Sequence, residues 1–127
     1  MILDITIIEA NENMCNELAQ VKKQVWNTTY RGIYPDYMID EFEFVKHESK
    51  FKNYIDSTHM KLYVAMIDKK IIGYTAIGTS LHHPDSNNME ILLLYLLKEF
   101  QGMRIGKKIF NFAKQKNTRK RELDFAF

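Results

Sequence analysis

Cysteine and clustered metal-binding residues are scarce in this chain of 127 residues. Cys15 is its single cysteine, so the chain has no internal disulfide, and one unpaired thiol suits a reducing cytoplasm. The four histidines are scattered, and one cysteine with scattered histidines does not make a zinc site. We therefore expect no bound metal and a cytoplasmic location.

Long apolar segments and a targeting segment are also lacking. The longest apolar run, Ile91 to Leu97, is far shorter than the roughly 20 residues that span a bilayer. The first residues include an early acid, Asp4, and no basic region of the kind that opens a signal peptide. We expect neither a membrane partner nor secretion.

Positive charge is concentrated near the C-terminus, although the net charge is only +2. Half of the 18 Lys and Arg residues fall within residues 98–127, which hold few of the 16 Asp and Glu residues. Such a segment favours an anionic partner near residues 100–121, either a phosphate-rich cofactor or a nucleic acid. The basic run over residues 114–122 has no interleaved aromatic residues and no nucleic-acid-binding motif accompanies it, which favours the cofactor.

Hydrophobic periodicity predicts one α+β domain over residues 1–127. Alternating or continuous apolar residues indicate strands, and apolar residues that recur every three or four positions indicate helices. The predicted order is β-α-α-β-β-β-α-β, and the second helix is expected to be broken. Strands are expected at residues 2–8, 61–67, 71–78, 89–97 and 123–127, and helices at 14–26, 35–55 and 105–113. The apolar stripe of the second helix is expected to contain Met38, Phe42, Val45, Phe51 and Ile55.

The most informative segment, residues 94–108, is a strand that runs into a glycine-containing turn and a basic helix. Free N–H groups at a helix start bind anions, and the helix dipole adds to the attraction. Glycine lets a diphosphate approach the backbone without meeting a Cβ atom. Lys107 and Lys108, in the first turn, oppose the helix dipole unless an anion is bound. The segment predicts a phosphate-binding turn.

This segment resembles the acetyl-CoA motif of the GNAT superfamily of N-acetyltransferases, Gln/Arg-x-x-Gly-x-Gly/Ala. Gln101 matches its first position and Gly106 its last, whereas Arg104 replaces the middle glycine. Residues 26–35 resemble the segment that joins the first two helices in one branch of the family, and residues 72–74 resemble part of its central hairpin. The likeness covers nearly the whole chain in the right order.

The resemblance implies a GNAT-like acyl-CoA N-acyltransferase fold, with a central mixed, mostly antiparallel sheet flanked by helices. It implies direct transfer of an acetyl group from acetyl-CoA, the co-substrate, to the primary amine of a small molecule or peptide, without a covalent enzyme intermediate. The cofactor-binding residues that it implies are Leu96 and Leu97 for the pantetheine arm, and Gln101, Gly102, Met103, Arg104, Ile105, Gly106 and Lys107 for the diphosphate.

The resemblance also implies candidate residues around the reacting groups. Glu90 begins the strand before the motif, where some GNAT enzymes carry the general base, and the alternative is a solvated carboxylate at a strand end. Tyr30 and Tyr34 belong to the segment that overhangs the acceptor in the family, so they are candidates for lining it, with structural packing as the alternative. Core or edge packing is the preferred interpretation of Tyr95.

Two departures from the family pattern leave the activity open. Arg104 costs about 1 kcal/mol or more if its backbone needs a positive φ, whereas on helical backbone its guanidinium can hold a phosphate. The family fold also continues through a further helix and two strands, which complete the acetyl pocket and often supply a tyrosine acid. This chain has no tyrosine after Tyr95. We therefore interpret the chain as truncated, with the final helix and strands missing.

The truncation leads to two further expectations. The alternative function is a non-catalytic GNAT remnant that folds and binds CoA weakly or not at all. An incomplete sheet also leaves an open edge, which predicts a homodimer formed through that edge.

Overall fold

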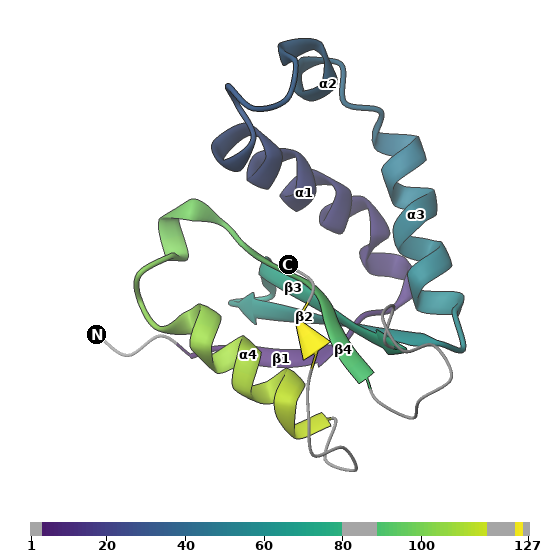
Figure 1. Ribbon diagram of the computed structural model, residues 1–127, viewed down its shortest axis with the longest axis vertical. Coiled ribbons are helices and arrows are strands. Elements are labelled where there is room, and N and C mark those ends of the chain that lie inside the picture. The colour runs from purple at the N-terminus through teal and green to yellow at the C-terminus, as the bar shows by residue number, and fades with distance from the viewer. Residues whose placement is uncertain (1–3, 80–88, 117–123, 126–127) are drawn as a thin grey trace.

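One sheet runs through the protein, with helices on both of its faces (Figure 1). The computed structural model describes residues 4–79, 89–116 and 124–125. Neighbouring strands are antiparallel from β1 to β4, and β5 is parallel to β4. The predicted mixed, mostly antiparallel sheet is thus confirmed. The strands follow one another in chain order: β1 (Thr6–Glu9), β2 (Met60–Ile67), β3 (Lys70–Thr79), β4 (Met89–Leu96) and β5 (Asp124–Phe125).

Helices α1 and α3 cover one face of the sheet, α4 covers the other, and the short α2 packs on α1 away from the sheet (Figure 1). The helices are α1 (Cys15–Thr29), α2 (Asp36–Asp40), α3 (Phe44–Asp56) and α4 (Ile105–Lys116), and short 3-10 turns precede α1 and follow β4 at η1 (Glu12–Met14) and η2 (Lys98–Phe100). The break expected in the second helix is confirmed, because α2 ends at Asp40 and α3 begins at Phe44.

The expected place of Val45 on the buried stripe is wrong. Its side chain is 77% exposed, since it lies on the solvent side of the first turn of α3.

The main core lies between the sheet and the pair α1 and α3. Leu18 and Val25 of α1 and Phe51 of α3 pack with Val64 and Tyr74 of the central strands. The α4 side adds its own buried residues, Ile105, Ile109 and Ala113. Burial raises the pKa of the Cys15 thiol above its usual value, with nearby acidic groups adding to the effect. Cys15 is therefore an apolar core contact rather than a reactive thiolate.

A β-bulge in β4 separates the part of the strand that pairs with β5 from the part whose outer edge has no partner strand among the described residues. Ala76 pairs with Leu93 but the next residue, Ile77, pairs with Ile91, so Leu92 has no partner across β3. On the other side, β5 pairs with β4 only at Glu90 and Ile91. Bulges bend the strand that carries them. Among the described residues, β4 therefore presents an unpaired edge after the bulge, and this edge leads directly to the start of α4.

An aromatic cluster joins the end of α1 to the segment before α3 and to the first turn of α3. We define it as Trp26, Tyr30, Tyr34, Phe42 and His47. The Trp26 ring meets the other four edge-on, at centroid distances of 6.3, 5.5, 5.4 and 5.1 Å, respectively. Tyr30 stacks on Tyr34 at 4.4 Å, and Phe42 stacks on His47 at 4.0 Å. Such pairs add to the free energy gained from burial of the rings.

The buried imidazole of His47 predicts acid sensitivity. Its side chain is only 6% exposed, and burial lowers its pKa to about 4, with the positive charges of Lys22, Lys50 and Lys46 adding to the effect. The folded pKa is below the unfolded value of about 6.5, so the unfolded chain binds more protons in that window and the free energy of unfolding falls as pH falls. We expect His47 to remove about 2 kcal/mol between pH 7 and pH 5. Urea unfolding at the two pH values measures the loss, and His47→Leu should show a smaller one.

Candidate functional site

The turn before α4 leaves a run of backbone N–H groups available. The N–H of Gln101 donates to the carbonyl of Lys98 at 3.1 Å, and that of Lys108 donates to the carbonyl of Arg104 at 3.2 Å. For the intervening N–H groups, residues 102–107, no backbone acceptor occurs within the described part of the chain. Because α4 runs for 12 residues, its dipole reinforces these donors. The turn has the elements of an anion site.

A hollow of about 410 Å³ opens beside these donors. It lies between the end of β4 and the start of α4, and its volume falls within the usual range of small-molecule sites. The residues that line it are Leu94, Leu96, Gln101, Gly102, Arg104, Gly106 and Lys107.

Two glycines border the hollow for different reasons. Gly102 has φ 80°, in the left-handed region that glycine adopts without steric cost. Gly106 has no positive φ, and a Cβ atom added to it would meet nothing within 4 Å. Neither packing nor backbone geometry requires glycine at position 106, and glycine inside a helix is costly. The open space above Gly106 suits a group that approaches the backbone closely.

Arg104 has φ 65°. Of the two conformations expected for it, the structure therefore has the strained one with positive φ rather than the helical one. A side chain at such a φ costs on the order of 1–2 kcal/mol. Arg104→Gly should therefore raise the free energy of unfolding by about 1 kcal/mol, measured by urea unfolding. Arg104→Ala is the matched control, because it removes the guanidinium but keeps the Cβ atom. An equal gain in both variants would contradict backbone strain as the cause.

Three basic side chains surround the start of α4 and have no carboxylate partner among the described residues. Arg104, Lys107 and Lys108 are exposed, and the ion pairs of the described residues involve none of them. Arg104 and Lys107 line the hollow, and all three line a second one of about 400 Å³ on the neighbouring surface of α4. Cations at a helix N-terminus oppose its dipole, so their gathering here favours a bound anion.

The end of β4 directs one carbonyl toward the hollow. The Leu97 N–H donates to the carbonyl of Ile72 on β3 at 2.9 Å. The Leu96 carbonyl belongs to the same peptide unit and points the opposite way, where it accepts a bond from Gln101 Nε2 at 3.0 Å. A carbonyl oxygen has two lone pairs, so Leu96 can accept a second bond from a ligand.

Not all of the residues implied for cofactor binding lie in this hollow. Ile105 is buried in the core and Met103 is 55% exposed, and neither lines it. Leu97 does not line it either, because its N–H bonds to Ile72 and its carbonyl accepts from Phe100. Leu94 lines the hollow but was not expected there. Its alternation with Leu96 along β4 is the signal that could have indicated it.

The family described as "Acetyltransferase (GNAT) domain" matches residues 13–125. The chain belongs to the GNAT acetyltransferase family. Its expected GNAT-like fold is confirmed by this match and by solved structures. The PaiA N-acetyltransferase of Thermoplasma acidophilum, solved with coenzyme A, gives a TM-score of 0.72 at 21% identity, over 92% of this chain and 74% of that one. The aminoglycoside N-acetyltransferase AAC(6′)-Iy, solved with CoA, also gives 0.72, at 16% identity, over 98% and 78% of the two chains.

Two curated relatives carry the same kind of description. An uncharacterized N-acetyltransferase in the pepI 3′ region of Lactobacillus delbrueckii subsp. lactis is 25% identical over 116 residues, which cover 88% of this chain and 67% of the relative. The uncharacterized N-acetyltransferase YuaI of Bacillus subtilis (strain 168) is 26% identical over 107 residues, which cover 83% and 60%. This GNAT chain thus spans about two thirds of the length of the relatives that it matches.

Glu90, the candidate base of this GNAT domain, is a buried residue. Its side chain is 0% exposed, which removes the alternative of a solvated carboxylate. In register it lies opposite Gly78 of β3 and Asp124 of β5, next to the pairing of Ile91 with Phe125. Glu90 is thus at the closed end of the junction between β4 and β5, just before the bulge that separates it from the open edge.

Tyr30 and Tyr34, the candidate acceptor-lining residues, lie on the face of the sheet that α1 and α3 cover. Tyr30 Oη lies 3.1 Å from Tyr95 Oη, and Tyr34 stacks on Tyr30. Burial raises the pKa of Tyr95 well above its usual value, and the hydrogen bond to Tyr30 adds to the effect. Tyr95 therefore keeps its proton at working pH and serves as a hydrogen-bonding group. The pair fixes the end of α1 over the strand that carries Leu94 and Leu96.

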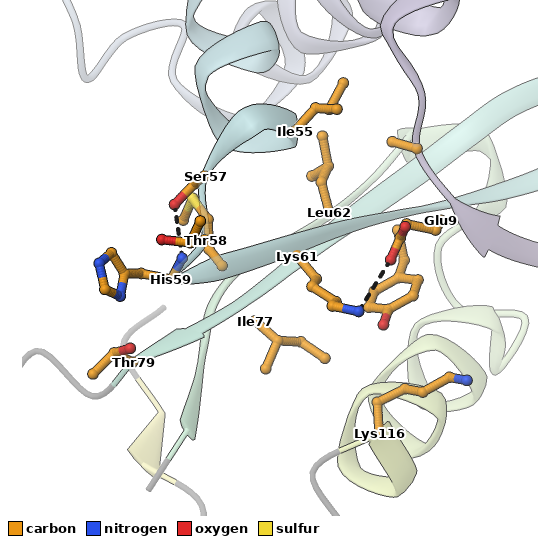
Figure 2. Close-up of a pocket in the computed structure, with 13 residues that line it drawn as sticks. Glu9, Ile55, Ser57, Thr58, His59, Lys61, Leu62, Ile77, Thr79 and Lys116 are labelled. Atoms are coloured by element: carbon orange, nitrogen blue, oxygen red, sulfur yellow. Dashed lines mark hydrogen bonds and ion pairs between the residues drawn. The ribbon is translucent and has the colours of Figure 1, made fainter. Parts of the chain in front are cut away.

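A larger hollow, of about 690 Å³, lies away from this turn (Figure 2). It is bordered by the ends of β2, β3, α3 and α4. Two pairs of its polar groups interact with each other. Lys61 Nζ is 3.5 Å from Glu9 Oε1, and the His59 N–H donates to Ser57 Oγ at 3.1 Å. Its charged lining includes the acid Glu9 as well as Lys61 and Lys116, whereas Arg104 and Lys107 line the hollow at α4 beside free N–H groups, so the smaller hollow is the better candidate site for an anion.

Neither a metal-binding cluster nor a membrane-spanning helix occurs in the described ranges. Within residues 4–79, 89–116 and 124–125, no three of the His, Cys, Asp and Glu side chains group in a way that could hold a metal ion. His82 and His83 lie outside these ranges. No helix in the described part of the chain has the length and apolar character needed to cross a bilayer.

Proposed function

We propose that this protein transfers the acetyl group of acetyl-CoA to the primary amine of a small molecule or peptide. The observation that carries the proposal is the hollow at the start of α4, where unpaired N–H groups, basic side chains and the open edge of β4 converge. The relatives and structural neighbours, which include an aminoglycoside N-acetyltransferase, support an amine acceptor. The family and its shared fold support the use of an acyl-CoA.

The residues present fit the charge and shape of CoA. The amides of residues 102–107, with Arg104 and Lys107, would hold its diphosphate. The space above Gly106 allows that group to approach the helix, and the outward carbonyl of Leu96 would accept a bond from the pantetheine arm. When bound, acetyl-CoA supplies the activated acetyl thioester.

The remaining roles belong to the chain on either side of β4. We assign Glu90 as the group that accepts the proton of the attacking amine, directly or through water, because it is a buried carboxylate next to the junction of β4 and β5. Tyr30 and Tyr34 would line the acceptor, with Tyr95 holding Tyr30 in place. The aromatic rings and phenol oxygens of this face suit an ammonium group.

Acetyl-CoA binding tests the site. Acetyl-CoA at 100 times its Kd should stabilise the protein by about 2.7 kcal/mol, seen as a rise in Tm. Gly106→Trp should abolish that rise, because its ring fills the hollow. The matched variant Gly106→Ala should keep or raise the Tm of the free protein, because the added methyl group meets nothing within 4 Å. No rise at millimolar acetyl-CoA would exclude both the transferase and a CoA-binding remnant.

If acetyl-CoA binds, release of the CoA thiol distinguishes a transferase from a non-catalytic CoA-binding remnant. A transferase releases CoA thiol from acetyl-CoA when the right amine is supplied, and Glu90→Gln should slow that release without weakening acetyl-CoA binding. Binding without release across a panel of polyamines, aminoglycosides and peptide amines would favour the non-catalytic remnant instead.

A further inference from the structure

Lys22 places its ammonium group over two aromatic rings at the edge of the core. It lies on α1 and is half-buried, with Nζ 5.5 Å from the centre of the Trp26 ring and 5.4 Å from that of Phe51. Phe51 is itself a buried core residue. Aromatic faces attract a cation, but a desolvated ammonium also needs hydrogen bonds or a counter-charge.

The charged groups near Lys22 do not neutralise its positive charge. Within the described part of the chain Lys22 forms no ion pair, whereas Lys52 has carboxylate oxygens of Asp56 and Glu12 at 2.8 and 3.9 Å. The charged group of α3 that acts on Lys22 is Lys50, which is also basic, and the nearby His47 is neutral at pH 7. Burial, with a smaller contribution from Lys50, lowers the pKa of Lys22 to about 8.

We propose that Lys22 is an acylation site, at which the amine attacks acyl thioesters such as acetyl-CoA. The lone pair of neutral Nζ attacks the thioester carbonyl carbon. The C–N bond forms, the C–S bond breaks, CoA leaves as the thiolate, and the extra proton on nitrogen passes to solvent. The reaction needs a thioester in solution and does not depend on the hollow at α4, so it goes beyond the proposed function.

Acylation at Lys22 would change the local charge balance. The product is a neutral amide that can remain against Trp26 and Phe51, and it no longer repels Lys50. Acylation also removes the Lys22 charge, which lowers the pKa of His47 more than the charges of Lys50 and Lys46 do. The acetylated protein should therefore have a higher His47 pKa and should lose less stability in mild acid.

Peptide mass spectrometry of the wild-type protein tests the proposal. The protein is treated at pH 7.5 with a limiting amount of acetic anhydride in one arm and with acetyl-CoA in the other. Lys22 should be acetylated at least about tenfold faster than Lys52 in both arms, because a pKa difference of over two units gives on the order of a hundredfold more neutral amine. The pKa of Lys52 is raised by its bond to Asp56, which makes Lys52 the internal control.

Each arm can overturn a different step. A Lys22 rate no higher than that of Lys52 with anhydride would overturn the claim of a reactive amine. Fast reaction with anhydride but none with acetyl-CoA would overturn the claim for thioesters. The Gly106→Trp protein should be acetylated at Lys22 as fast as the wild type, so failure of the CoA site leaves this test intact. The His47 pKa, followed by NMR, should rise after acetylation, and an unchanged value would contradict the predicted charge effect.

Discussion

Replacing Trp26 by alanine is expected to lower the free energy of unfolding by about 3 kcal/mol. Trp26 is the shared neighbour of the four other rings of the aromatic cluster, at 5.1 to 6.3 Å between centroids. Its removal deletes several edge-to-face contacts and leaves a space that the rigid helix α1 cannot close by a small movement. The loss should also loosen Tyr30, and with it the hydroxyl contact to Tyr95.

The measurement is urea unfolding followed by far-UV circular dichroism, since the chain has 1 tryptophan and the variant has none to report by fluorescence. Trp26→Phe is the matched control, because it keeps a ring in the cluster and should cost less than half as much. A loss below 1 kcal/mol for Trp26→Ala would mean that the cluster contributes little to holding α1 on the sheet.

The order of the elements could be predicted from the sequence because buried positions are apolar and recur with the period of a helix or a strand. Leu18 and Val25 recur at helical spacing on α1, and the strand over 61–67 is apolar at both alternating sets of positions. Periodicity records which residues are apolar, not which way each one points at the end of an element. Val45, in the first turn of α3, is apolar and exposed.

The phosphate-binding turn could be located, but its details depend on backbone geometry. Glycine spacing and basic charge indicated the start of α4, since both follow from residue type. The positive φ of Arg104 could be stated only as one of two outcomes, because arginine has no preference that reveals it. The bulge at Leu92 and the Gln101 bond to Leu96 depend on strand register and side-chain rotamer, which periodicity does not encode.

Gly73→Ala is expected to cost about 3 kcal/mol, although it adds a single methyl group. A Cβ atom at position 73 would lie 2.6 Å from the carbonyl oxygen of Tyr95 and 3.0 Å from Leu96 Cδ1. The first of these is backbone of the paired strand, so the methyl group can be accommodated only if β3 and β4 move apart. Leu94 and Leu96 of β4 line the hollow, so acetyl-CoA affinity should fall together with stability.

The control for Gly73→Ala is the same substitution at Gly106, where the added methyl group meets nothing within 4 Å. Both variants add one Cβ atom, so they differ in the contact that this atom makes within the free protein. Without any ligand, Gly73→Ala should lose stability, whereas Gly106→Ala should keep or raise it. A loss at position 106 is expected only in the stabilisation by acetyl-CoA. Chemical unfolding with and without acetyl-CoA separates the two. If Gly73→Ala unfolded at the wild-type urea concentration, β3 and β4 could not be as close at Tyr95 as the structure has them, and the wall of the hollow would be misplaced.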